Sequence, residues 1–281
     1  VMIYDFDNFD PKQLVTVINR YGVTSFCAPP TVYRYLVRKG IESMPTLKHA
    51  STAGEMLAPE VFRKFTQETG IPLCEGYGQT ETTLLMANFK GRQPKEGAMG
   101  TVSPFYNIEL RDKDGKQVSD GQIGEVVIIP PASGKQAGVF TGYLDNEEQY
   151  KYVWRGGVYH TGDAAYRDSD GLYWFHGRFD DIIKTGGFRG GPYEIENVLM
   201  EHPAVVECSV IGVPDKLRGQ AIKAVIVPGH GYEPTRELEL AIKEFCNRRL
   251  AEYKWVRLVE FVSAMPKTIS GKIKKTELRK G

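Results

Sequence analysis

Residues 47–81 read LKHASTAGEMLAPEVFRKFTQETGIPLCEGYGQTE. Short apolar runs lie near Leu47–Thr52 and Leu73–Tyr77, and the segment Pro59–Thr69 between them carries apolar residues at helical spacing: Val61, Phe62 and Phe65. A strand, a helix and a second strand in succession are typical of parallel strands joined by a crossover helix. This stretch therefore predicts a parallel α/β sheet.

The same alternation extends towards the N-terminus. Asp10 is followed by Pro11, a typical helix start, and the apolar helical face that follows ends at Gly22. A buried strand is expected over Val23–Ala28, and a further helix over Pro30–Lys39. The first ninety residues thus continue one α/β pattern.

Two further patterns follow along the chain. From about residue 95, short alternating runs such as 107–111 and 125–129, separated by Asp-Gly turns, predict an antiparallel β subdomain. After Gly177 a glycine-rich hairpin precedes expected helices over 192–201 and 235–251 and strands over 205–213, 221–227 and 256–262. We expect three parts: an α/β portion (1–95), a β subdomain (96–179) and a compact α+β domain (180–281).

The composition is that of an ordinary globular protein. Of 281 residues, 41% are hydrophobic and 25% charged, and 36 Lys+Arg against 35 Asp+Glu leave a net charge of +1. This excludes disorder and provides no broad basic surface for nucleic acid. Apolar runs of about 18 residues, as a membrane span needs, do not occur, and the four cysteines form no CxxC pair. A reducing, cytoplasmic setting fits best.

Common nucleotide and metal motifs are missing. The sequence holds no G-x-x-x-x-G-K-[ST] loop, and Gly76 and Gly78 lack the third glycine of a dinucleotide fingerprint because position 81 is Glu. The five histidines show no metal-ligand spacing such as HExxH.

Four polar segments remain as candidates for chemistry, and each is expected where an α/β sheet binds ligands, beyond a strand end. Taken singly, each is more often an ordinary turn, hairpin end or solvated tail. The segments are STAGE (51–55), GYGQTE (76–81), YHTGD (159–163), and the set GRFD (177–180), GGFR (186–189) and PKTISGK (266–272).

In this order the segments resemble the adenylate-forming (AMP-binding) superfamily, and 186–196 and 263–268 are most similar to medium-chain acyl-CoA synthetases. The resemblance covers essentially the whole chain. It implies the C-terminal part of the large N-terminal domain (parallel α/β sheet plus antiparallel β subdomain), followed by a small, mobile α+β C-terminal lid. It also implies ATP-dependent activation of a carboxylic acid to acyl-AMP and thioester formation with coenzyme A, with Mg²⁺ as cofactor.

The resemblance assigns nucleotide-binding roles in the first part of the chain. Gly54 and Glu55 match residues that line the adenine edge, and Tyr77 matches the aromatic residue against its face. Thr80 matches a hydroxyl that contacts phosphate. Glu81 matches the Mg²⁺ ligand, in keeping with the hard oxygen donors that this ion prefers.

The resemblance also assigns roles near the lid. Asp163 and Arg178 match the residues that hold the ribose hydroxyls, for which an acceptor-only carboxylate is well suited. Asp180 matches the hinge about which the lid turns between the half-reactions. Lys272 matches the lysine that bridges the substrate carboxylate and the α-phosphate in adenylation.

By the same resemblance, the hairpin of Gly186 and Gly187 approaches the site in the thioester-forming step, where a narrow passage requires backbone without side chains. Arg189 is the candidate for a phosphate contact in that state. Gly190 stands where the family has a bulky apolar residue, so we expect a looser hairpin.

The acyl pocket can be argued from one position. Gly78 replaces the bulky indole of acetate-specific relatives, which predicts room for a medium-chain or aromatic acid. Ala28, at a strand end, is a candidate for the pocket lining, although core packing explains it equally well.

The loop that grips the β- and γ-phosphates in this family is absent and is expected upstream of Val1. The chain is therefore expected to be a C-terminal half with weak or no catalysis alone, and a mitochondrial address upstream stays open. Two alternatives to an acyl-CoA ligase remain: an adenylation domain that loads a carrier protein, and a non-catalytic nucleotide- or CoA-binding module. The oligomeric state is not indicated.

Overall fold

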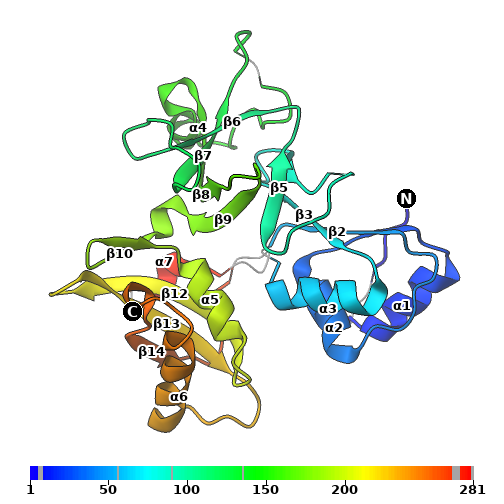
Figure 1. Cartoon of the computed structure of the whole chain (residues 1–281). Coiled ribbons are helices and arrows are strands. Elements are labelled where there is room, and N and C mark those ends of the chain that lie inside the picture. The colour runs from blue at the N-terminus through cyan, green and yellow to red at the C-terminus, as the bar shows by residue number, and fades with distance from the viewer. Residues whose placement is uncertain (6–8, 56, 90, 135, 268–272, 280–281) are drawn as a thin grey trace. The chain divides into compact units, whose positions relative to one another are not determined.

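The computed structural model describes residues 1–281 apart from 6–8, 56, 90, 135, 268–272 and 280–281, and the side chains of Asp180 and Arg189 also lie outside the description (Figure 1). The chain divides into two compact units. The first comprises Val1–Thr161 and Ala165–Phe175, and the second comprises Gly162–Ala164 and His176–Gly281.

The first unit begins with alternating helices and strands and continues with antiparallel strands. In chain order these are α1 (Pro11–Arg20), β1 (Ser25–Cys27), α2 (Pro30–Lys39), β2 (His49–Ala53), α3 (Pro59–Thr69), β3 (Leu73–Gly78), β4 (Leu84–Ala87), β5 (Ala98–Val102), β6 (Asn107–Arg111), β7 (Gly124–Ile129), α4 (Glu147–Val153) and the 3₁₀ turn η1 (Arg155–Gly157). Strands β8 (Tyr159–Arg167) and β9 (Tyr173–Arg178) contribute residues to both units.

Local signals set the helix ends of the first unit, as predicted. The Asp10 carboxylate accepts the Lys12 amide at 3.0 Å, and Pro11 opens α1. Helix α3 ends at Thr69, and the next residue, Gly70, has a φ of 72°, the left-handed conformation usual after a helix end.

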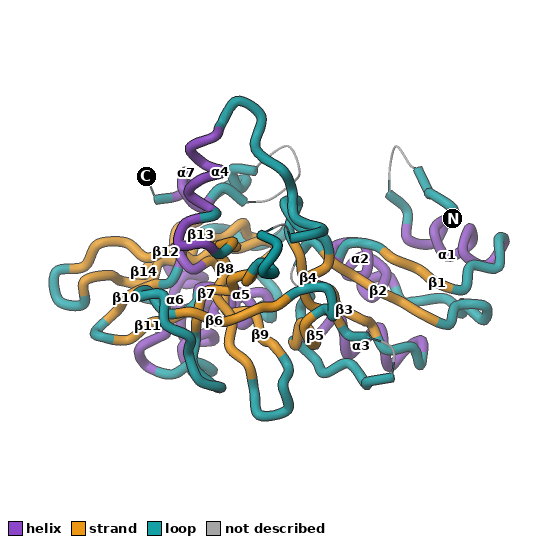
Figure 2. The backbone as a smooth tube through the Cα atoms, turned by 90° about the horizontal axis from the view of Figure 1, so that it is seen from above, coloured by secondary structure: helices purple, strands orange, loops and turns teal. Residues whose placement is uncertain are grey.

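One hydrogen-bonded path joins the strands of the first unit in the order β1-β2-β3-β4-β5-β9-β8-β7-β6. The pairs β1·β2 and β2·β3 are parallel, as predicted, whereas β3·β4, β4·β5, β5·β9 and β6·β7 are antiparallel. Figure 2 shows β1, β2 and β3 side by side. The parallel strands place their carboxyl ends, followed by Ala28, Gly54 and the bend after Tyr77, along one edge of the sheet.

The second unit is an α+β domain. Its elements are η2 (Phe179–Asp181), β10 (Ile183–Thr185), β11 (Phe188–Gly190), α5 (Pro192–Met200), β12 (Val205–Asp215), β13 (Gly219–Pro228), α6 (Arg236–Asn247), η3 (Glu252–Lys254), β14 (Leu258–Phe261) and α7 (Lys275–Leu278). The strand order is β11-β10-β13-β12, with β14 parallel to β13.

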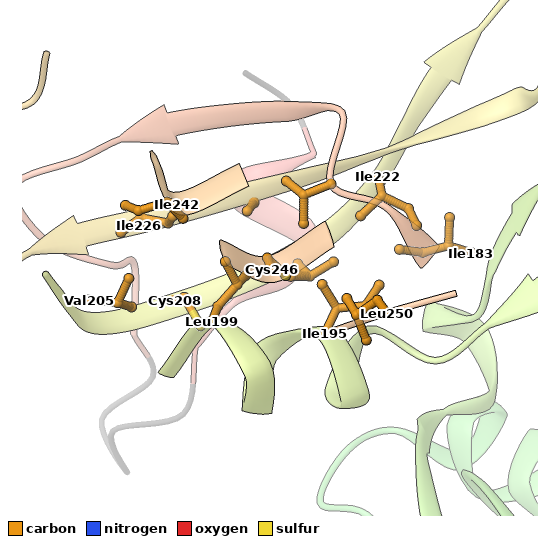
Figure 3. Packing of buried hydrophobic residues seen from close by; sticks show 13 residues of the cluster. Ile183, Ile195, Leu199, Val205, Cys208, Ile222, Ile226, Ile242, Cys246 and Leu250 are labelled. Atoms are coloured by element: carbon orange, nitrogen blue, oxygen red, sulfur yellow. The ribbon is translucent and has the colours of Figure 1, made fainter. Parts of the chain in front are cut away.

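The core of this domain lies between its sheet and the helices α5 and α6. In Figure 3, Ile195 and Leu199 of α5 and Cys246 of α6 face Ile222 and Ile226 of β13, and all five are buried. Fully buried apolar side chains stabilise a fold by about 1.5–3 kcal/mol each.

Helix α6 is shorter than the predicted span 235–251, because it ends at Asn247. The Asn247 side chain accepts the Val256 amide at 2.8 Å and donates to the Val256 carbonyl at 3.2 Å. These two bonds join the end of α6 to the backbone of Val256, and the buried Leu250 between them packs into the core.

Candidate functional site

Strand β3 ends in a bend that requires glycine. Its pairing with β4 shifts register between Tyr77 and Gly78, and a Cβ at Gly78 would lie 2.5 Å from the Thr83 carbonyl oxygen. The Gln79 amide donates to Thr82 Oγ1 at 3.0 Å, which closes the turn. The bend therefore presents residues 79–82 at the carboxyl edge of the parallel strands.

Gln79 stabilises this bend by two side-chain hydrogen bonds, although no sequence pattern indicated a role for it. Its Nε2 donates to the Thr161 carbonyl at 2.8 Å, and its Oε1 accepts the Tyr159 hydroxyl at 3.1 Å. Both partners lie about eighty residues away in sequence, so local spacing does not reveal them. Its place between Gly78 and Thr80, within a segment already singled out, was the only available signal.

The bend brings four predicted residues together: Tyr77, Gly78, Thr80 and Glu81. The half-buried Tyr77 ring lies 6.1 Å from that of Phe175, and Thr80 is exposed. Glu81 is half-buried, and its Oε1 accepts the Tyr143 hydroxyl at 3.0 Å. Tyr143 is a second residue that the sequence did not indicate.

Glu81 fits the Mg²⁺ role chemically. A carboxylate that accepts one hydroxyl keeps further lone pairs for a cation, and Mg²⁺ is usually held by one or two carboxylates with phosphate and water oxygens. Within the described ranges, His, Cys, Asp and Glu form no group of three or more that could hold a metal ion by itself. Glu81 would therefore need phosphate and water oxygens to complete the coordination of Mg²⁺.

The loop after β2 carries Gly54 and Glu55. Strand register pairs Ala53 with Gly76, so this loop and Tyr77 follow neighbouring strand ends. Gly54 has a φ of +91°, and a Cβ there would meet no atom within 4 Å, while Thr31 Oγ1 donates to Glu55 Oε2 at 2.7 Å. The exposed backbone of Gly54 is thus accessible to a planar ligand.

Ala28 follows β1 at the same edge of the sheet. Its amide donates to the Ser51 carbonyl at 3.2 Å, and its side chain packs against the cluster formed by α1, α2 and α3. The pocket role of Ala28 stays a prediction. A separate hollow, lined by residues such as Asn88, Arg92 and Asp170, contains none of the predicted site residues.

In the second unit, Asp163 and Arg178 are brought together. Arg178 Nη1 donates to Asp163 Oδ1 at 2.9 Å, and the Asp163 side chain is 8% exposed against 48% for Arg178. A carboxylate has more acceptor sites than one guanidinium N–H occupies, and it accepts hydroxyl donors well once its orientation is fixed. The pair therefore suits the predicted ribose role.

The glycine-rich hairpin of the second unit has an open tip. Gly186 and Gly187 adopt φ values of +56° and +84°, are exposed, and have nothing within 4 Å of an ideal Cβ. A Cβ at Gly190 would also meet nothing within 4 Å, so no neighbouring atom requires glycine at this position. The backbone of Arg189 pairs with Lys184.

Three predicted residues are described only in part or not at all. Asp180 lies in η2, but its side chain, like that of Arg189, is outside the description. Lys272 lies outside the described residues. On either side of its segment, Lys267 and Ile273 form an antiparallel bridge, and the Lys274 amide donates to the Pro266 carbonyl at 2.8 Å.

A parallel-strand edge with an aromatic, a hydroxyl and a carboxylate on one bend is typical of ligand-binding α/β proteins. The AMP-binding enzyme family matches residues 1–144, and the AMP-binding enzyme C-terminal domain matches residues 194–272. The chain belongs to the AMP-binding enzyme family.

Similar proteins include acyl-CoA synthetases and CoA ligases. The mitochondrial acyl-coenzyme A synthetase ACSM3 of Homo sapiens is 42% identical over 100% of this chain and 48% of its own length. 4-Hydroxybutyrate–CoA ligase 1 of Metallosphaera sedula is 41% identical over 96% and 48%. The chain thus spans about half the length of the curated relatives it matches.

Solved structures have the same fold. The anthranilate CoA ligase AuaEII in complex with anthranoyl-AMP has a TM-score of 0.81 and 32% identity, over 96% of this chain and 52% of its own. ATP-bound MatB from Rhodopseudomonas palustris has a TM-score of 0.83 and 28% identity, over 98% and 54%. Among the described helices, none is long and apolar enough to cross a membrane.

Proposed function

We propose that the protein containing this chain is an AMP-forming acyl-CoA ligase. The observation that carries the proposal is the bend after β3, where Tyr77, the exposed Thr80 and the Glu81 carboxylate follow parallel strands at the edge where such sheets bind nucleotides. Relatives named as acyl-CoA synthetases and CoA ligases, at about 40% identity, support this proposal.

In the first half-reaction, a carboxylate oxygen of the acid bonds to the α-phosphorus of ATP, the bond from that phosphorus to the bridging oxygen breaks, and pyrophosphate leaves. Two anions meet in this step, so cationic groups and positioning lower its barrier. Lys272 supplies the cation, Tyr77 and Gly54 bind the adenine, and Asp163 with Arg178 orients the ribose. Glu81 would hold Mg²⁺, which would offset the phosphate charge.

In the second half-reaction, the CoA sulfur bonds to the acyl carbonyl carbon, AMP leaves, and the thiol proton passes to solvent. The chain turns at Asp180 between the two steps. The open Gly186-Gly187 backbone then faces the pantetheine arm, and Arg189 contacts phosphate.

The acid is proposed to be medium-chain or aromatic. Gly78 carries no side chain that could shorten a pocket, and one structural relative is named as a ligase of anthranilate and another as a ligase of benzoate. A cytoplasmic location is proposed, with the mitochondrial matrix as the alternative because several relatives are named as mitochondrial.

The test uses the full-length protein that carries this chain. Carboxylate-dependent ATP–pyrophosphate exchange is expected and should be abolished by Lys272→Ala, whereas thioester formation from supplied acyl-AMP and CoA should survive. Lys243→Ala, on α6, is the matched control and should retain both. Wild-type exchange without CoA thioester formation would favour a carrier-protein substrate, and absence of exchange would favour a non-catalytic binding module.

A further inference from the structure

The hairpin β10–β11 is supported mainly on one side. Among the described strands, β11 pairs with β10 only, and β10 meets β13 at a single register pair, Thr185 with Gly219. Two polar bonds strengthen the β10 side: the Gly186 amide donates to the Arg218 carbonyl at 3.0 Å, and the Lys184 amide donates to Gln220 Oε1 at 2.8 Å. The β11 side needs another support.

An aromatic stack supplies that support. The Phe188 ring on β11 lies 4.7 Å from the Tyr253 ring in η3, with an interplanar angle of 20°. Phe188 is 56% exposed, so this contact, rather than burial in the core, holds its ring. Offset-stacked aromatic pairs change an equilibrium by about 2- to 10-fold beyond their burial.

Tyr253 belongs to a well-anchored segment. Lys254, its neighbour, forms an ion pair with Glu194 of α5, and the Lys254 amide donates to the Ala251 carbonyl at 2.8 Å. The Lys254 ammonium also lies 5.2 Å from the Tyr253 ring centroid, within the range of a cation–π contact. These contacts hold the segment of Tyr253 in place, so its ring can support β11, which pairs with β10 only among the described strands.

The hairpin tip has no side chains of its own to hold it. Gly186 and Gly187 offer backbone only, and nothing lies within 4 Å of their Cβ positions. Apart from the bond of the Gly186 amide to the Arg218 carbonyl, the orientation of the tip depends on the residues that flank it, Thr185 on β10 and Phe188 on β11.

We propose that Tyr253 is a positioning residue for the thioester-forming step, because its ring holds Phe188 and thereby fixes the Gly186-Gly187 tip. This inference rests on the proposed ligase function. It predicts a selective defect: loss of the Tyr253 ring slows the CoA-dependent half-reaction and leaves adenylation unchanged, since adenylation uses Lys272 rather than the hairpin.

The experiment compares Tyr253→Leu, Tyr253→Phe and wild type in the full-length protein. Tyr253→Leu should slow acyl transfer from supplied acyl-AMP to CoA by about 2- to 10-fold, keep ATP–pyrophosphate exchange within twofold, and speed amide hydrogen exchange of a peptide spanning residues 183–190. Tyr253→Phe keeps the ring and should restore all three values. Phe245→Leu removes another aromatic pair of this domain, with His202 at 5.0 Å, and is the matched control.

Equal loss of both half-reactions in Tyr253→Leu, or a matching loss in Tyr253→Phe or Phe245→Leu, would overturn the proposal. Unchanged hydrogen exchange over 183–190 in Tyr253→Leu would do the same, whatever the activity. If wild type catalyses neither half-reaction, the ligase function fails, and faster exchange in the variant then still reports the stack as the support of the hairpin.

Discussion

Arg178 lies over Gly162 and donates to Asp163 Oδ1 at 2.9 Å, so one guanidinium fixes the carboxylate that follows the Thr-Gly step of β8. Gly162 has a φ of +69°, and a Cβ there would overlap Arg178 Nη2. The glycine thus serves the ion pair in two ways: it adopts the left-handed backbone, and it leaves room for the arginine.

Asp163→Asn should weaken ATP binding by about 10- to 100-fold, because hydrogen bonds to a charged group contribute about 1.5–3 kcal/mol. Asparagine keeps the shape but loses the charge and half of the acceptor capacity. Calorimetric titration with a non-hydrolysable ATP analogue measures the effect. Asp120→Asn, which alters the exposed pair of Asp120 with Arg167, is the control. Equal affinity in Asp163→Asn and wild type would remove Asp163 from the ribose site.

Gly78→Trp should shift the acid preference towards short chains if this position borders the acyl pocket. The structure adds a complication, because any Cβ at residue 78 lies 2.5 Å from the Thr83 carbonyl. Both Gly78→Ala and Gly78→Trp should therefore cost about 1–3 kcal/mol of stability through overpacking.

The ratio of kcat/KM for propionate to that for octanoate separates the two effects. Only the tryptophan variant should raise it, since alanine adds the clash without the indole. A similar rise in Gly78→Ala would attribute the change to the turn, and an unchanged ratio in Gly78→Trp would contradict the pocket argument.

Much of the fold could be predicted from sequence because its signals are local. Helices α1, α2 and α3 begin at proline and end near glycine within a residue or two of the expected positions. Strands β4 and β5 were not predicted: β4 pairs with its sequence neighbours β3 and β5, whereas β5 also pairs with a distant strand. An example is Gly100 of β5, which pairs with Tyr173 of β9. The continuous path from the parallel strands into the antiparallel ones follows from these pairs.

The candidate site likewise has a part that could be predicted from sequence and a part that could not. The bend at Gly78 is visible in sequence as glycines around an aromatic residue, and its residues do share one turn. The contacts that hold it, from Gln79 to Thr161 and from Tyr143 to Glu81, join segments 62 or more residues apart. Periodicity carries no information about such pairs.

Because of Glu75 on β3, we expect the free energy of unfolding to depend on pH. Burial raises the pKa of its carboxyl to about 7, although the Leu57 amide bonded to it opposes the shift. Thr52, opposite Glu75 in strand register, is 1% exposed, and its hydroxyl has no hydrogen-bond partner among the described residues.

Because the folded state holds the proton more tightly than the unfolded state, this group's contribution to stability falls as pH rises from about 4.5 to about 7. Glu75→Gln removes that loss and should raise the free energy of unfolding at pH 8 by on the order of 3 kcal/mol, with no gain at pH 4. Urea denaturation across this range measures it. Glu68→Gln, at an exposed carboxylate that also accepts a backbone amide, is the control. A Glu75→Gln gain that is the same at both pH values would rule out titration of this group.

Lys275 should matter for adenylation although it lies three residues beyond Lys272. Its Nζ donates to Glu196 Oε1 at 2.7 Å and to the Val210 carbonyl at 3.3 Å, and Glu196 Oε1 also accepts the Val210 amide at 2.7 Å. Both side chains of the ion pair are about one-fifth exposed. The contact ties α7 to α5 and β12, next to the bridge of Lys267 with Ile273.

Lys275→Met leaves Glu196 without its cation and should cost about 1–3 kcal/mol of stability. It should also lower ATP–pyrophosphate exchange more than acyl transfer from supplied acyl-AMP, because it loosens the attachment of the chain that carries Lys272. Lys275→Arg keeps the charge and should retain both rates, and Glu260→Gln breaks the Lys223 pair elsewhere in the domain as a control. If Lys275→Met lowers the two rates in proportion to its loss of folded protein, the pair contributes to stability alone, since a positioning effect requires the ratio of the half-reactions to change.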